Sequence, residues 1–185
     1  MIFKLTHNNT SLWFEAKRNP IIGQDSGVFV LKLTKKKNLQ CLIDSSDADW
    51  LNCWDWGINR SKSGKIYAVR YFRKNSNRGL IYLHRAVLGF PQGEVDHING
   101  NTLDNRRENL RVCTHQQNQC NRKIGKNNTS GFKGVYFNKN NNNYRSEICF
   151  KNKKYFLGYF KSALEASKAY NKKSIELHGN FSRLS

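Results

Sequence analysis

The stretch Asp96–Arg111, which reads DHINGNTLDNRRENLR, decides how the middle of this chain folds. Glu94–Ile98 lies between two glycines, and we predict a short strand there. Leu110–Cys113 is predicted to form a second short strand. Thr114 is a good N-cap for a helix that continues to about Asn121. The stretch therefore predicts a compact unit of strand, long loop, strand and helix.

Three side chains of this unit suit hydrolysis with a metal ion. Asp96 and His97 are adjacent near a strand end, where they can serve one site in two roles. Asn118 lies one turn into the following helix and can face back to the strand. A carboxylate and an amide oxygen suit Mg²⁺ or Mn²⁺ better than Zn²⁺. A neutral imidazole nearby is the usual general base near neutral pH.

Residues 84–122 resemble the core of HNH endonucleases, most closely those of the phage and intron-encoded homing type. The matching runs have fixed spacing and are Leu83-His84-Arg85, Asp96-His97-Ile98-Asn99-Gly100-Asn101, Leu103-Asp104-Asn105-Arg106, Glu108-Asn109-Leu110-Arg111 and Thr114-His115 with Asn118. The resemblance implies a ββα-metal nuclease core. Asn118 stands where many HNH proteins have a final histidine, which favours Mg²⁺ or Mn²⁺ over zinc.

The resemblance also implies a role for each matching position. Asp96 and Asn118 would bind one divalent cation together with a DNA phosphate. His97 would be the general base that takes a proton from the attacking water. Asn109 would brace the loop and fix the His97 ring. The products would carry 3′-hydroxyl and 5′-phosphate ends.

Some positions of the motif also have simpler interpretations. Asp96 can cap the loop, and Asn105 and Asn109 are expected to satisfy buried backbone groups. For His84 we favour structural packing or a phosphate contact over a chemical role. His115 could be an auxiliary ligand or a DNA contact, and we prefer an ordinary exposed histidine in the first turn of the helix.

The last part of the chain has the pattern of a small sheet with one helix. Alternating runs at 131–137, 144–150 and 154–160 predict three antiparallel strands. Ser162 begins a helix over 163–177, which ends at His178-Gly179. One face of the sheet would be covered by the helix, and the other would be free to meet DNA.

This segment resembles the Apetala-type, ethylene-responsive-factor DNA-binding domain. The resemblance rests on matching runs such as Ser130-Gly131-Phe132-Lys133-Gly134-Val135, Leu157-Gly158-Tyr159-Phe160 and Leu177-His178-Gly179. In that family the strands lie in the major groove. By position, the DNA contacts would be Lys133, Tyr136, Asn138, Arg145, Glu147, Lys153 and Tyr155. A solvated basic sheet is the simpler alternative.

The N-terminal part is β-rich, with candidate strands at 28–33, 65–72 and 80–83. The run 44–47 could cap a short helix that contains Trp50 and Leu51. Trp50, Trp54 and Trp56 are interpreted as a small core rather than a platform for stacking bases. No catalytic constellation is recognisable in this part.

Charge points to a polyanionic partner. The chain of 185 residues has 32 Lys and Arg but 13 Asp and Glu, a net charge of +19. Residues 1–83, 84–126 and 127–185 carry +8, +3 and +8, so two basic flanks enclose a nearly balanced middle. That balance is expected where a centre must also hold a cation. Five cysteines without a CxxC pair argue against a disulfide framework and a four-thiolate zinc site.

Together these features predict an α+β protein in four parts: a β-rich region at 1–83, the nuclease core at 84–122, a linker at 123–130 and the DNA-binding domain at 131–185. We predict a site-selective homing or nicking DNA endonuclease. The alternative is a DNA-binding regulator with an inactive nuclease core, and an RNA-binding protein fits the charge alone. The expected partner is double-stranded DNA rather than a membrane. We expect a monomer. We also expect the protein to lie in the cytoplasm of a bacterial or phage-infected cell, because no apolar run long enough to span a membrane and no signal peptide is evident.

Overall fold

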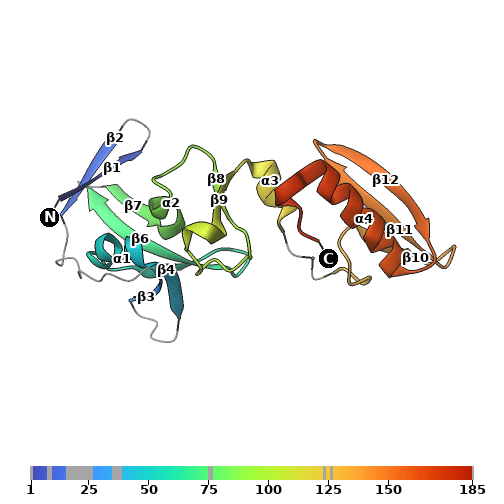
Figure 1. The fold of residues 1–185 in the computed structure, drawn as a ribbon, viewed down its shortest axis with the longest axis horizontal. Coiled ribbons are helices and arrows are strands. Elements are labelled where there is room, and N and C mark those ends of the chain that lie inside the picture. The colour runs from blue at the N-terminus through green and yellow to red at the C-terminus, as the bar shows by residue number, and fades with distance from the viewer. Residues whose placement is uncertain are drawn as a thin grey trace. The chain divides into compact units, whose positions relative to one another are not determined.

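The computed structural model describes residues 2–7, 10–15, 27–34, 39–74, 77–122, 124–125 and 127–184, with only the backbone for 2–7, 10–15, 74 and 77. The chain divides into two compact units, with the boundary between Val112 and Cys113. This boundary falls inside the predicted nuclease core, and the predicted division into four parts stays a prediction. Figure 1 shows the elements of each unit.

The first unit begins with strands in small antiparallel sheets. The hairpin β1 (Ile2–His7) and β2 (Thr10–Glu15) is followed by the pair β3 (Val28–Lys32) and β4 (Gln40–Asp44). Helix α1 (Ser45–Asn52) follows β4 directly. The sheet β5 (Gly57–Arg60), β6 (Ile66–Lys74) and β7 (Asn77–Tyr82) is also antiparallel. The β-rich character predicted for this region is confirmed.

The second half of this unit is short and loop-rich. Helix α2 (Leu83–Val87) leads to β8 (Glu94–His97), and the turn η1 (Arg107–Asn109) leads to β9 (Leu110–Cys113). β8 and β9 pair as a two-stranded sheet. Both strands lie where they were predicted. A ββα-metal fold also needs helix α3 (His115–Cys120), which belongs to the second unit, so that fold stays a prediction.

A tryptophan-rich core stabilises the first unit. Trp54 and Trp56 are buried, together with Leu51 of α1 and Ile43 of β4. The indole of Trp56 donates to the Leu51 carbonyl at 2.9 Å, so its polar atom is satisfied. Trp50 packs against this cluster, with its ring centroid 5.8 Å from that of Trp54. The three tryptophans therefore form a core, as predicted.

The second unit contains a three-stranded antiparallel sheet and a long helix. The strands are β10 (Val135–Asn138), β11 (Asn143–Phe150) and β12 (Lys153–Phe160), in that order. Helix α4 (Ala163–His178) packs on this sheet, and the turn η2 (Gly179–Phe181) follows it. Ser162 accepts from the backbone N–H of Glu165 and caps α4, as predicted.

The first strand of this sheet begins later than predicted. Residues 131–134 form a bend and a turn, and the strand starts at Val135. Gly131 and Gly134 both have positive φ, which extended strands do not contain. The hydroxyl of Ser130 donates to the Val135 carbonyl at 2.8 Å and closes the turn. The whole protein is thus of mixed α+β type with several small antiparallel sheets. None of the helices in the described ranges is both long and apolar enough to span a bilayer.

Candidate functional site

Asp96 and His97 lie at the end of β8 and are both buried, at 7% and 5% exposure. The Asp96 Oδ2 accepts from Nε and Nη2 of Arg111 on β9, at 2.9 and 2.7 Å. The strand pair β8–β9 brings this ion pair together, because the two residues lie on neighbouring strands. The Arg111 guanidinium thus balances the buried carboxylate charge.

The His97 ring is held by a buried amide. His97 Nε2 lies 3.2 Å from Oδ1 of Asn105, whose own Nδ2 donates to the Cys41 sulfur at 3.2 Å. Because the Asn105 nitrogen is used by Cys41, its oxygen faces the imidazole and Nε2 must be the donor. This assigns the proton of the neutral ring to Nε2 and the lone pair to Nδ1.

Burial keeps the His97 ring neutral. Desolvation lowers the pKa of His97 below its usual value, and the hydrogen bond to Asn105 opposes this shift in part. A neutral imidazole with a lone pair on Nδ1 is the form that a general base needs.

Aromatic rings from the first unit surround His97. The ring centroids of His84 and Tyr67 lie 5.1 and 6.3 Å from that of His97, and Tyr82 packs on His84 at 5.3 Å. His84 is 8% exposed, and burial lowers its pKa to about 3. A buried neutral histidine fits the packing interpretation better than a phosphate contact. Tyr67 and Tyr82 lie outside the motif, and no sequence signal indicated them.

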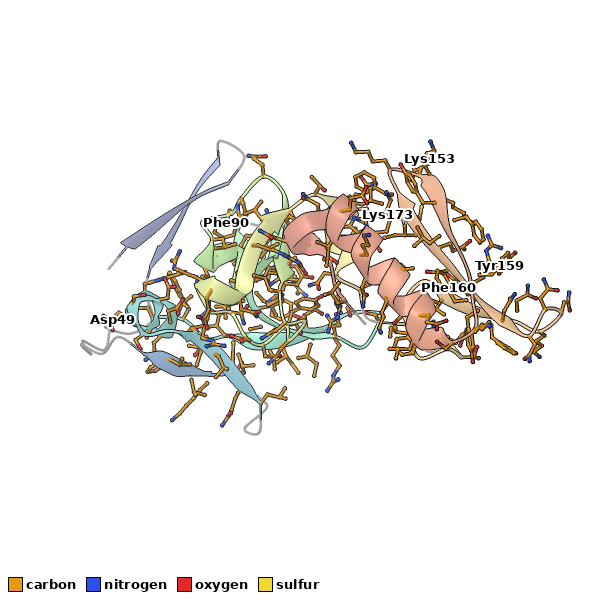
Figure 2. All side chains as sticks on the ribbon, turned by 45° about the vertical axis from the view of Figure 1, so that its right-hand side comes forward. Asp49, Phe90, Lys153, Tyr159, Phe160 and Lys173 are labelled. Atoms are coloured by element: carbon orange, nitrogen blue, oxygen red, sulfur yellow. The ribbon has the colours of Figure 1, made fainter. Side chains whose placement is uncertain are left out.

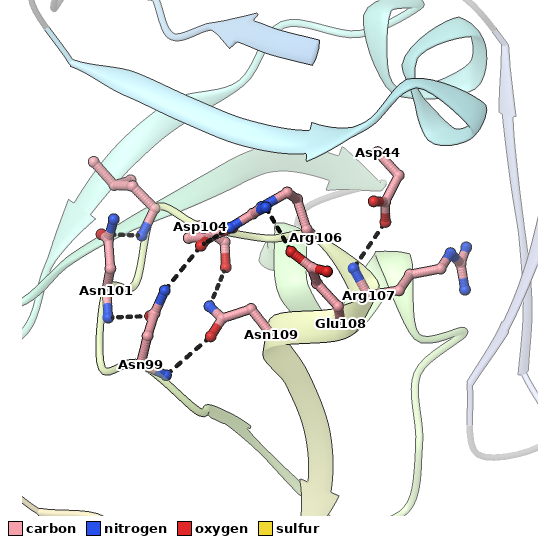
Figure 3. Close-up of polar contacts among 9 residues, drawn as sticks. Asp44, Asn99, Asn101, Asp104, Arg106, Arg107, Glu108 and Asn109 are labelled. Atoms are coloured by element: carbon pink, nitrogen blue, oxygen red, sulfur yellow. Dashed lines mark hydrogen bonds and ion pairs between the residues drawn. The ribbon is translucent and has the colours of Figure 1, made fainter. Parts of the chain in front are cut away.

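Asn109 braces the loop between β8 and β9 (Figure 3). Its side-chain oxygen accepts from the Asn99 backbone N–H at 2.9 Å, and its nitrogen donates to the Asp104 carbonyl at 2.8 Å. Asn99 also donates to the Asp104 carboxylate at 2.9 Å. Arg106 donates to both oxygens of this carboxylate and holds the pKa of Asp104 below its usual value. Several side-chain hydrogen bonds within the loop therefore fix its conformation.

The β-rich region binds residues 103–107 of this loop. The backbone N–H of Arg107 donates to Asp44 at 2.8 Å, and its guanidinium donates to Asp47 at 2.9 and 2.7 Å. The backbone of Leu42 bonds that of Leu103 and Asn105, at 2.8 and 2.7 Å. The run 44–47 was predicted to cap this helix, and Asp44 lies at the N-cap position of α1, but its side chain makes no cap hydrogen bond and binds the loop. Residues of the N-terminal β-rich region, where no catalytic constellation was recognised, thus hold the loop that carries the motif.

The sequence around this site is similar to known proteins. Residues 83–120 match the HNH endonuclease family. Protein 3.8 of Escherichia phage T7 is 35% identical over 119 residues, which cover 63% of this chain and 96% of that protein. The chain belongs to the family of phage T7 Protein 3.8. Its HNH domain contains all four residues that the motif singles out, Asp96, His97, Asn109 and Asn118.

The oxygen donors of the HNH domain fit a hard divalent cation. Asp96 supplies a buried carboxylate and Asn118 an amide oxygen, and both are hard donors. Among the described residues no cluster of three or more His, Cys, Asp or Glu could hold a metal. A small number of protein ligands is enough for Mg²⁺, because the ion keeps several of its waters and also binds substrate phosphate oxygens. Asn118 lies on α3 in the second unit, so its pairing with Asp96 stays a prediction.

The residues predicted to contact DNA all belong to the second unit, but they do not share one surface. Tyr136, Arg145 and Tyr159 are neighbours across the three strands, and all are exposed. Arg145 donates to Glu147 at 2.5 Å, and its guanidinium lies 5.7 Å from the Phe156 ring. These five residues define the open face of the sheet, and Figure 2 shows Tyr159 on the side away from α4. Tyr159 and Phe156 also lie on this face, although neither was among the predicted contacts.

The other predicted contacts lie elsewhere. Tyr155 pairs with buried Ile148, and the ammonium group of Lys173 on α4 lies 5.6 Å from its ring, so Tyr155 is on the helix side. Lys153 lies over the same ring, at 5.7 Å. The Asn138 side chain accepts from the Asn140 backbone N–H at 3.1 Å, within the hairpin turn. Lys133 is half-buried, and its ammonium group donates to the Cys120 carbonyl of α3.

Proposed function

We propose that this protein is a DNA endonuclease that hydrolyses phosphodiester bonds with one divalent cation, Mg²⁺ or Mn²⁺, and His97 as general base. The observation that carries the proposal is the buried His97 ring beside Asp96, with its Nε2 bound to Asn105 at 3.2 Å. In this tautomer Nδ1 carries the lone pair, so it is the ring atom that would take a proton from water. The match to the HNH endonuclease family supports the same chemistry.

In this mechanism His97 Nδ1 takes the proton from the water that attacks the scissile phosphorus. Asp96 and Asn118 would hold the cation, and Asp96 would exchange its partner Arg111 for it. When bound, the cation stabilises the added charge on the phosphate and the leaving 3′ oxygen. The products carry 3′-hydroxyl and 5′-phosphate ends. Asn109 and Asn105 keep the loop and the ring in place.

We further propose that the second unit holds duplex DNA on the open face of its sheet, in the manner of an Apetala-type domain. Residues 127–185 carry 11 basic and 3 acidic residues, and Arg145 and Tyr136 lie on that face. Charge of this kind supplies affinity for the phosphate backbone. A chain with one HNH site cuts one strand, so a monomer would nick a homing site.

Nicking of supercoiled plasmid tests the nuclease. We expect Mg²⁺ or Mn²⁺ to support conversion to nicked circles, and EDTA or His97→Ala to abolish it. His115→Ala is the matched control, because this exposed histidine lies at the start of α3 and is assigned no role in catalysis. Equal nicking by His97→Ala would show that another group is the base.

The second candidate is a DNA-binding regulator whose nuclease core is inactive. Such a protein would shift plasmid or duplex DNA in a gel without nicking it at any concentration of Mg²⁺ or Mn²⁺. The intact set of Asp96, His97 and Asn118 favours the nuclease, because an inactive core has no need for these three side chains.

A further inference from the structure

The helix α3, which carries Asn118, has little of its own to keep it folded. It is six residues long, and none of its residues is buried. It lines a cavity of about 860 Å³ together with Tyr136, Ile148 and Tyr170, so it is not packed tightly on the sheet. Helices this short are marginal in water, because nucleation costs more than a few hydrogen bonds return. The stability of α3 must therefore come from its two ends.

The N-terminal end is capped from within the helix. The Thr114 hydroxyl accepts from the Gln117 N–H at 3.2 Å, and the Gln117 side chain accepts from the Thr114 N–H at 2.8 Å. This reciprocal pair is a capping box, which satisfies two of the backbone N–H groups that a helix start leaves without partners.

The C-terminal end is capped by cations from the second unit. The Lys133 ammonium group donates to the Cys120 carbonyl, and Arg183 Nη1 donates to the Asn121 carbonyl at 3.3 Å. Cationic groups at the last carbonyls of a helix also interact favourably with its dipole. The Cys120 sulfur lies 3.2 Å from Nδ1 of His178, at the end of α4. Three residues outside the HNH motif thus hold the last turn of α3.

The position of Lys133 supports this structural use. Burial lowers the pKa of Lys133, so its charge is held in a partly desolvated place where it needs an acceptor. The Cys120 carbonyl supplies that acceptor. A lysine engaged in this way serves α3, whereas the open face of the sheet carries Arg145.

We propose that Lys133 and Arg183 are positioning residues of the nuclease: by capping α3 they fix the Asn118 amide, the proposed metal ligand, on its helix. This inference rests on the proposed function, in which Asn118 is a metal ligand. The proposal makes cation binding depend on Lys133 and Arg183, which lie outside the motif, as well as on the motif itself.

The test uses the full-length chain with Lys133→Met and Arg183→Met, each measured without DNA. Hydrogen exchange should show that the amides of residues 118–121 lose about tenfold in protection, as expected for loss of a charge-assisted hydrogen bond. Titration with Mn²⁺ alone should show about tenfold weaker binding. Lys133→Arg should restore both, because it keeps a donor at the Cys120 carbonyl. Lys168→Met, on the exposed side of α4, is the charge-matched control and should change neither.

Asn118→Ala separates the two proposals. If it weakens Mn²⁺ binding while Lys133→Met and Arg183→Met leave both exchange and Mn²⁺ affinity unchanged, the capping proposal is wrong and the metal assignment stands. If Asn118→Ala leaves Mn²⁺ affinity unchanged, both are wrong. Loss of DNA affinity in EDTA by Lys133→Met, with normal exchange in α3, would make Lys133 a DNA contact and overturn the proposal.

Discussion

At the scale of single residues, the chemistry of His97 depends on a partner that the motif does not assign to it. Asn109 was expected to fix the His97 ring, and its side chain instead binds the backbone of Asn99 and Asp104. Asn105 contacts the ring through its side-chain oxygen, because its nitrogen donates to Cys41 in the core. The tautomer of the proposed base is thus set through a residue of β4.

Asn105→Ala should lower the nicking rate by about tenfold to a hundredfold, because the ring loses the acceptor that fixes its tautomer. The rate is measured on supercoiled plasmid at saturating Mg²⁺. Asn140→Ala, at an exposed position in the turn between β10 and β11, is the control and should keep the rate. A normal rate in a folded Asn105→Ala protein would show that this contact does not orient the base.

His84 should make the first unit acid-sensitive. Its pKa is about 3 when folded and 6.5 when unfolded, so below pH 6.5 the unfolded chain binds a proton that the folded chain does not. Stability should fall by about 1.4 kcal/mol per pH unit as pH drops from 6.5 toward 3. Urea unfolding followed by tryptophan fluorescence measures this, since all four tryptophans lie in residues 1–112. In His84→Phe the slope should decrease by this amount, and an unchanged slope would count against a neutral His84.

At the scale of elements, short segments are held by contacts with distant parts of the same unit. The loop between β8 and β9 is bound by β4 and α1, and α3 is bound by Lys133 and Arg183. These elements have too few buried side chains to be stable alone. Their conformations therefore depend on the units that surround them.

Gly134→Ala should destabilise the second unit more than Gly131→Ala. Both glycines have positive φ, so both substitutions add about 1 kcal/mol of backbone strain. A Cβ on Gly134 would also lie 2.2 Å from the Tyr170 ring and 2.6 Å from the Glu147 carbonyl, whereas nothing lies within 4 Å at Gly131. Overpacking of this kind adds about 1–3 kcal/mol. Hydrogen exchange of the α4 amides compares the two variants, and equal effects would contradict the close approach.

At the scale of the whole molecule, the charge of +19 is shared by segments with different roles. Residues 1–83 and 127–185 each carry a net charge of +8, whereas residues 84–126 carry +3 and contain Asp96, which Arg111 neutralises. On the open face the Arg145 charge is paired with Glu147, and the Lys133 charge lies partly inside the fold, so most of the excess charge of residues 127–185 belongs to other lysines. Only the exposed part of this charge can bind phosphates.

Arg145→Ala should weaken DNA binding and reduce the slope of log K against log salt by about 0.9, because one phosphate contact is lost. Binding to a duplex in EDTA over a range of salt concentrations measures the slope. Lys168→Ala on α4 is the control and should leave it unchanged. An unaltered slope for Arg145→Ala would exclude this residue as a phosphate contact.

The sequence by itself determined the strands β8 and β9, the cap of α4, the tryptophan core and the match of residues 83–120 to HNH endonucleases. These features depend on local spacing and on composition, which a sequence displays directly. Only the tertiary structure decided that Asn105 holds His97, that Asp44 and Asp47 hold the loop, and that Lys133 caps α3 rather than lying on the open face. Each of these contacts joins residues separated by 8 to 63 positions or belongs to a half-buried side chain. Folding sets such neighbours through packing and burial, and no local pattern encodes them.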